Sequence, residues 1–191
     1  VLELSGDLEG KGIMPIPPYI RSGRAEEKDK EVYQTVYADK EGSIAAPTAG
    51  LHFTDELLAS LENSGVEHDF ITLHVGSASF SPVREENFRD YQMPQEFFSI
   101  SEELIARIKK AKSEGRRVVS VGTTTTRALE SAFSREGFCG SDDFFSTELY
   151  ITPGYEFKII DVLITNFHQP RTTHLLMVAA FVGEKETEKI Y

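Results

Sequence analysis

The hydrophobic and polar positions of the chain follow two periods, one near 3.6 residues and one of two residues. Apolar residues at helical spacing, with polar capping residues at their starts, predict helices over residues 55–64, 101–113 and 127–135. Runs rich in β-forming residues predict strands over residues 33–38, 66–75, 117–122 and 157–165, the third of them buried. Because strands and helices alternate, we expect an α/β domain with a largely parallel or mixed sheet. Its functional loops should lie beyond the carboxyl ends of the strands.

The first thirty residues do not share this pattern. Residues 1–20 hold three glycines and three prolines, which favour extended chain and turns over helix. Residues 21–31 alternate basic and acidic side chains with almost no apolar ones, which is typical of a solvated linker or loop. We therefore predict a boundary here, followed by a main domain over residues 21–191.

Composition and charge restrict the class of protein. The chain has 191 residues, 40% of them hydrophobic, which is enough to fold around a core. Its net charge of −11 repels polyanions, so a contact with RNA needs a local basic patch. Cys139 is the only cysteine, which excludes an intrachain disulfide and favours a reducing, cytoplasmic setting. We expect no membrane association, and the N-terminus, which lacks both Met and a signal region, indicates the inside of a longer protein.

A run of four threonines, Thr123 to Thr126, lies between the predicted strand that ends at Gly122 and the predicted helix that begins at Arg127. Free N–H groups at a helix N-terminus attract anions, and threonine hydroxyls and a guanidinium add donors. The run therefore predicts a cradle for a phosphate or a carboxylate. The alternative is a strand-to-helix turn that is capped by one threonine.

Three histidines, His52, His74 and His168, are predicted to lie at strand ends or just before a helix, where α/β enzymes carry working side chains. Histidine suits acid–base catalysis because its ordinary pKa lies near neutrality. The alternative for each is a hydrogen-bonded structural role. Zinc is a weaker interpretation, since no metal-binding spacing of histidines is present, and we predict no metal.

Basic side chains gather along the predicted helix 101–113 and just after it. They are Arg107, Lys109, Lys110, Lys112, Arg116 and Arg117. This set fits either a contact with an RNA backbone or the solvated face of a surface helix.

Five short blocks follow one another along the chain: MPIPPYI at 14–20, YQTVYA at 33–38, APTAGLHFT at 46–54, VGTT at 121–124 and TNFH at 165–168. From about residue 13 to 183 the chain closely resembles the S-adenosylmethionine:tRNA ribosyltransferase-isomerases of queuosine biosynthesis. The resemblance implies an enzyme that transfers and isomerises the ribosyl moiety of S-adenosylmethionine onto a 7-aminomethyl-7-deazaguanine at the wobble position of tRNA. The product would be epoxyqueuosine-tRNA, with adenine and methionine released. S-Adenosylmethionine is thus a substrate, and no cofactor is implied.

The resemblance also implies a fold, a mixed sheet curled into a half-barrel with flanking helices. A small β-barrel is inserted in the family's N-terminal half, and most of it is missing here. Residues 1–20 are therefore expected to be the end of that insert with a linker, and residues 21–191 a main α/β domain truncated at its C-terminus. We expect a cytoplasmic monomer whose partners are tRNA and S-adenosylmethionine.

Residue chemistry and the resemblance together indicate a candidate site. The predicted catalytic residues are His52 and His74, as acid or base, and Glu96, as a base or a counter-charge for the sulfonium. The predicted substrate-binding residues are Thr48, Gly50, Thr123, Thr124, Arg127, Tyr155, Asn166 and His168. Tyr155, Phe53 and Phe167 are candidates for stacking on adenine or on a base of the tRNA, with a core role as the alternative.

The chain departs from the family pattern at six positions. Ala78 and Ser79 stand where the family has Gly and Thr, Tyr91 and Pro94 where it usually has histidines, and Gln169 and His174 where it has apolar residues. Together with the missing ends, these departures support one alternative, a non-catalytic RNA-binding relative or inactive fragment. A further alternative, a hydrolase of phosphorylated small molecules, would use the threonines, the three histidines and a metal.

Overall fold

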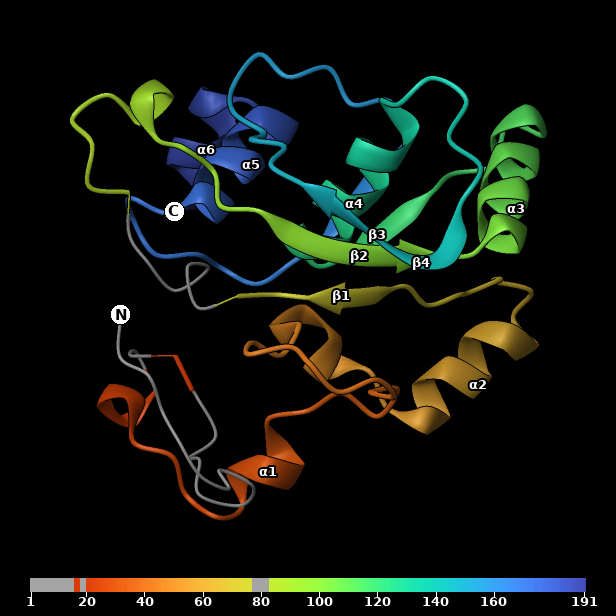
Figure 1. Ribbon diagram of the computed structural model, residues 1–191, viewed down its shortest axis with the longest axis horizontal. Coiled ribbons are helices and arrows are strands. Elements are labelled where there is room, and N and C mark those ends of the chain that lie inside the picture. Colours follow the sequence, from red (N-terminus) through yellow and green to blue (C-terminus); the bar gives the residue numbers. More distant parts are fainter. Residues whose placement is uncertain (1–15, 18–19, 77–82) are drawn as a thin grey trace.

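The computed structural model describes residues 16–17, 20–76 and 83–191 and has a mixed α/β architecture, as predicted (Figure 1). The prediction for residues 1–20 therefore falls almost wholly outside the described residues, and so do Ala78 and Ser79.

The strands of the described residues form two sheets rather than one. The first is antiparallel, in the order β1-β2-β4, with β1 (Thr72–His74), β2 (Glu96–Ile100) and β4 (Ser141–Thr147). The second is a parallel pair, β3 (Val119–Val121) and β5 (Val162–Ile164). The helices are α1 (Asp29–Val32), α2 (Asp55–Asn63), α3 (Glu102–Ser113), α4 (Thr123–Phe133), α5 (Thr173–Val182) and α6 (Glu184–Ile190).

The main core lies where α3 and α4 pack against the inner face of β2. Phe98 and Ile100 are each 1% exposed, and the helices add Leu104, Ile105, Ile108, Ala128, Leu129 and Ala132. In Figure 1, α3 to α6 lie on one side of β1, and the part of the chain that carries α1 and α2 lies on the other. Among the described residues, no helix combines the length and the apolar character needed to cross a bilayer.

Two of the predicted helices are confirmed, and each begins at a side-chain cap. Thr54 begins α2, and its Oγ1 accepts a hydrogen bond from the N–H of Leu57 at 3.2 Å. Ser101 begins α3 in the same way, accepting from the N–H of Leu104 at 3.2 Å. A side-chain oxygen that satisfies one of the first free N–H groups fixes where a helix starts, so these two starts were readable from the sequence.

The third helix begins earlier than predicted, because the threonine run belongs to α4. Gly122 is its N-cap residue, with φ +92°, a backbone conformation that glycine adopts at little cost. The buried hydroxyl of Thr126 lies 2.9 Å from Oγ of Ser120 and 3.1 Å from the carbonyl oxygen of Gly122. This contact with β3 holds residues of modest helix propensity in a helix, so the prediction of a loop at Thr123–Thr126 was wrong.

Other predictions need correction at the level of local structure. Residues 33–38 form turns and no strand, and the strands predicted over 66–75, 117–122 and 157–165 shrink to three residues each. Of β3, Ser120 is buried, whereas Val119 is 48% exposed. Residues 21–31 are not a plain solvated loop, since they contain α1 and the buried carboxylate of Asp29, which pairs with Arg21.

Candidate active site

A buried ion pair lies at the centre of a small pocket between β2, α4 and α5. It joins Glu96, the first residue of β2, to Arg127, in the second turn of α4. The side chains of Glu96 and Arg127 are only 9% and 5% exposed, respectively. The pocket around them is lined by Met93, Glu96, Thr123, Thr124, Arg127, Leu149, Tyr150, Ile151, Thr173, His174 and Met177.

The positive end of α4 also faces this pocket. Thr123 and Thr124, the first two residues of the helix, line it, so their side chains and the helix N-terminus share the space with Arg127. Nε of Arg127 is buried and has no hydrogen-bond partner in the described part of the chain. A guanidinium with a spare buried donor beside a helix N-terminus suits an anionic group with several acceptor oxygens, such as a carboxylate.

The α5 side of the pocket contributes a histidine that sequence analysis noted only as a departure. The ring of His174 stacks on that of His168, with centroids 5.1 Å apart and planes inclined by 21°. Nε2 of His168 lies 2.9 Å from the hydroxyl of Thr165. His174 thus connects the pocket to the TNFH block through His168.

Both of these histidines are neutral at pH 7. Burial lowers the pKa of His168 to about 4, with a smaller effect from His174. Burial likewise lowers the pKa of His174 to about 4, assisted by the charge of Arg127. An imidazole of this kind gives a ligand one donor and one acceptor and no charge. In the described residues, no three His, Cys, Asp or Glu side chains are placed to hold a metal ion together.

His52 and Asn166, both predicted site residues, meet directly although they are 114 positions apart. Nε2 of His52 lies 3.2 Å from Oδ1 of Asn166. Because an amide oxygen only accepts, Nε2 donates, and Nδ1 of the neutral ring is left with its lone pair. His52 is an exposed residue at the end of the 3-10 turn η2 (Thr48–His52).

His74, in contrast, does not join the pocket. It pairs with Phe97 in the register of β1 and β2, and directly opposed residues point to the same face of a sheet. Glu96 precedes Phe97 and therefore points to the other face. The ring of His74 stacks on Phe144, with centroids 4.4 Å apart, and packs against Gly42, where a Cβ would lie 2.8 Å from Cε1. The structure thus separates His74 from Glu96.

Two further predicted site residues, Gly50 and Tyr155, contact neighbouring side chains outside the pocket. Gly50 lies against Tyr37, and a Cβ at this position would come within 1.9 Å of its hydroxyl oxygen. The hydroxyl of Tyr155 donates to Oε2 of Glu130 at 3.1 Å, and its ring meets Phe157 edge-on. Neither residue lines the pocket, and Thr48, which begins η2, does not line it either.

Tyr91, a departure from the family pattern, packs on Tyr150 beside the pocket, with ring centroids 5.6 Å apart. Burial raises the pKa of Tyr91, and burial raises that of Tyr150 to about 12. Both phenols stay protonated at neutral pH, so neither serves as a general base.

Four of the six basic residues on and after α3 form ion pairs with neighbours. Arg107 pairs with Glu67 and Asp69, Arg116 with Glu67 and Glu114, Lys110 with Glu114, and Lys112 with Asp161. Nζ of Lys109 donates to the carbonyl of Phe138 at 3.3 Å. Side chains paired in this way favour the solvated helix face over the RNA contact.

Comparison with known proteins decides the family. The family model described as "Queuosine biosynthesis protein" matches residues 2–191. The chain belongs to this family. Curated relatives named S-adenosylmethionine:tRNA ribosyltransferase-isomerase are 47% identical over 184 residues in Rickettsia bellii (strain OSU 85-389) and 48% identical over 193 residues in Halothermothrix orenii. These alignments cover 96% and 99% of this chain but 52% and 55% of the relatives, so the chain spans about half their length.

A solved structure of the same family shares the fold. The crystal structure of the S-adenosylmethionine tRNA ribosyltransferase from Thermotoga maritima aligns with a TM-score of 0.58 and 36% sequence identity. The alignment covers 75% of this chain and 44% of that one. The resemblance read from the five sequence blocks is thereby confirmed.

Of the candidate residues, the structure gathers Glu96, Thr123, Thr124 and Arg127 in one pocket. His52 and Asn166 form a second group, and His168 links to the pocket through His174. Sequence reasoning missed His174 as a site residue. The signal that could have found it is its place at the start of an apolar helix, where a histidine is unusual.

Proposed function

We propose that the chain takes part in transferring and isomerising the ribosyl moiety of S-adenosylmethionine onto the 7-aminomethyl-7-deazaguanine wobble base of tRNA, with epoxyqueuosine-tRNA, adenine and methionine as products. Family membership and the names of the curated relatives support this activity. The structural observation that carries it is the buried Glu96–Arg127 pair beside the N-terminus of α4.

The charges that line this pocket match the methionine end of S-adenosylmethionine, which bears a carboxylate, an ammonium group and the nearby sulfonium. The free volume of the pocket, about 10 Å³, holds about one water molecule, so its lining side chains have to move apart when the ligand binds. Arg127, with its spare Nε, and the first turn of α4 bind the carboxylate. Glu96 then faces the positive ammonium or sulfonium group. Because the carboxylate of Glu96 is already held by a guanidinium, we assign it this electrostatic role in preference to that of a base.

Two proton movements remain to be placed in the reaction. A base removes a proton from the carbon beside the sulfonium, and an acid gives a proton to the departing adenine. His52 fits one of these steps, because it is an exposed residue whose ring is oriented by Asn166 through Nε2, which leaves Nδ1 outside this hydrogen bond. His74, on the opposite face of the sheet from Glu96, is left without a part in this pocket.

The proposal includes a cytoplasmic setting, a monomer and the absence of a cofactor, which remain predictions. The curled half-barrel and the small inserted β-barrel that the resemblance implies are predictions as well. They are consistent with a chain that spans about half the length of its curated relatives.

The test is to incubate the full chain with S-adenosylmethionine and a tRNA that carries 7-aminomethyl-7-deazaguanine, and to quantify adenine by chromatography. We expect adenine release that depends on this tRNA and is absent with a tRNA that carries guanine at the wobble position. Tight binding of tRNA without adenine release would favour the alternative of a non-catalytic RNA-binding relative.

A further inference from the structure

Phe167 is the most exposed large hydrophobic side chain of the described residues, at 76%. Leaving an aromatic ring in water forgoes the free energy that its burial would provide. Phe167 lies next to Asn166, whose side chain meets His52. The backbone of Phe167 is therefore one residue away from the side chain that contacts the candidate acid–base residue His52.

The backbone on both sides of this ring is held in place. On one side, the Asn166 side chain bonds to His52. On the other, the N–H of His168 donates to the hydroxyl of Tyr191 at 3.0 Å. The ring of Tyr191 also meets Phe167 edge-to-face, with centroids 5.3 Å apart and planes at 74°. Such a contact covers little of the Phe167 ring, so the ring is oriented but largely uncovered.

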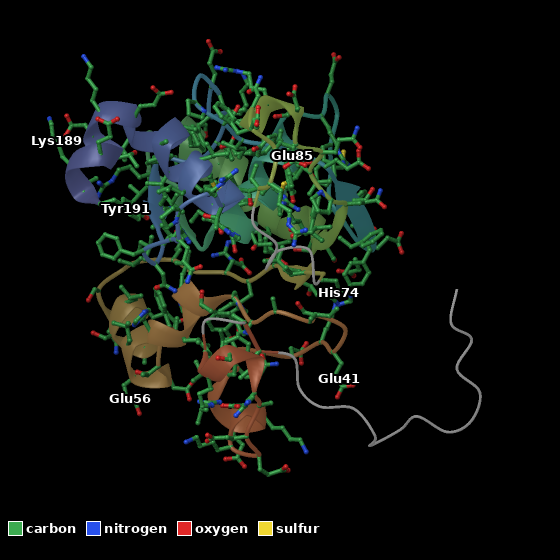
Figure 2. All side chains as sticks on the ribbon, turned by 90° about the vertical axis from the view of Figure 1, so that its left-hand side faces the viewer. Glu41, Glu56, His74, Glu85, Lys189 and Tyr191 are labelled. Atoms are coloured by element: carbon green, nitrogen blue, oxygen red, sulfur yellow. The ribbon has the colours of Figure 1, made fainter. Side chains whose placement is uncertain are left out.

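This aromatic surface, formed by Phe167 and Tyr191, lies away from the ring of His74. Figure 2 shows Tyr191 on one side of the molecule and His74, which stacks on Phe144, on the other. Both lie near the level at which the part bearing α1 and α2 meets the rest of the chain. The ring of Phe167, which contacts Tyr191, is thus on a different side of the molecule from His74.

We propose that Phe167, one residue along the chain from Asn166, stacks on a nucleobase of the tRNA that has left its helical stack. The inference rests on the proposed function and specifies a surface for its RNA substrate. Unpaired RNA bases are commonly bound by stacking on aromatic side chains, and stacking needs no positive charge. That suits a chain with a net charge of −11 whose basic helix is largely ion-paired.

The test compares tRNA affinity across variants of Phe167 in the full chain, using tRNA with 7-aminomethyl-7-deazaguanine. We expect Phe167→Ala to weaken binding about tenfold or more, the usual effect of losing one stacked base. Phe167→Trp should keep the affinity, whereas Phe167→Leu, which is apolar but not aromatic, should lose most of it. Phe97→Ala is the matched control, since it removes another exposed ring, at 45%, from a strand face. Affinity for S-adenosylmethionine should be the same in all four variants.

The outcomes separate this inference from the proposed function. If the unmodified chain binds tRNA and Phe167→Ala binds it equally well, the stacking surface is wrong and the proposed function stands. If the unmodified chain does not bind tRNA, both fail. Sedimentation velocity tests whether a second copy of the chain covers the ring instead. A dimer that Phe167→Ala converts to a monomer, with tRNA affinity unchanged, would make the ring a contact between copies of the chain.

Discussion

Arg127 and Glu96 form a buried ion pair that fixes the beginning of α4 against the beginning of β2. Burial lowers the pKa of Arg127, and the Glu96 carboxylate opposes that effect. A buried pair of this kind is costly to break, because one partner is left as an isolated charge away from water.

We predict that Arg127→Met destabilises the fold by about 3–5 kcal/mol, because it leaves Glu96 buried and unpaired by a guanidinium. The double variant Glu96→Leu/Arg127→Met should recover most of that loss, since both charges are then absent. Urea unfolding of the single and double variants measures both effects. Equal destabilisation by the two would show that the pair is not coupled.

A second buried carboxylate, Glu130 of α4, organises the segment that leads into β5. It is fully buried, and it accepts hydrogen bonds from the N–H groups of Lys158, Ile159 and Ile160 and from the hydroxyl of Tyr155. We predict that Glu130→Ala destabilises the chain by at least about 3 kcal/mol, because it orphans three backbone donors. Tyr155→Phe removes one bond and should cost about 1 kcal/mol. Urea unfolding that ranks the two variants the other way would contradict this role.

These contacts show what the sequence could and could not predict. The starts of α2 and α3 were predictable because Thr54 and Ser101 act locally, within three residues of the N–H groups they cap. The start of α4 was not, since it depends on a contact between Thr126 and Ser120 of β3. The β-forming residues 33–38 turn instead of pairing, because a strand also needs a neighbour that the sequence does not specify.

The sequence predicted which residues belong to the candidate site better than it predicted which of them lie together. The five blocks pointed to His52 and Asn166, and the structure joins them across 114 positions. His74 and Glu96 were both predicted as catalytic residues, but strand alternation places the two on opposite faces of the sheet. The pairing register of the three residues of β1 with β2 decides which face His74 shares, and no local sequence pattern encodes that register.

Stability should fall with acid because of His168 and His174. Their pKa values are lowered from 6.5 to about 4 on folding. Between pH 6.5 and 4 the unfolded chain therefore binds protons that the folded chain does not, and the free energy of unfolding drops as the pH is lowered through this window. The slope is at most about 1.4 kcal/mol per pH unit for each histidine.

Urea unfolding at pH 7.5, 6.5, 5.5 and 5 tests this expectation, with His168→Gln/His174→Gln as the comparison. The double variant should have a distinctly shallower dependence on pH. Parallel curves for the two proteins would mean that other groups carry the acid sensitivity.

His52 is expected to contribute to turnover and not to stability. We predict that His52→Ala lowers kcat by about 10² or more, the usual size of one general acid–base contribution. Asn166→Leu should lower kcat less, and it should alter the pH profile because the imidazole loses its orienting partner. Steady-state assays of adenine release give both values, with unfolding curves to confirm that the fold is unchanged. A loss below threefold for His52→Ala would remove it from the mechanism.

The central claim is that the Glu96–Arg127 pocket binds the carboxylate of S-adenosylmethionine, and calorimetric titration with two ligands tests it most directly. Decarboxylated S-adenosylmethionine keeps the sulfonium and the amine but lacks the carboxylate. The unmodified chain should prefer S-adenosylmethionine by about tenfold or more, which matches one hydrogen-bonded charge contact. In the double variant Glu96→Leu/Arg127→Met this preference should vanish. Both ligands lose the contact with Glu96 in this variant, so their difference in affinity reports only on the carboxylate. A preference that survives in the double variant, or is absent from the unmodified chain, would contradict the account.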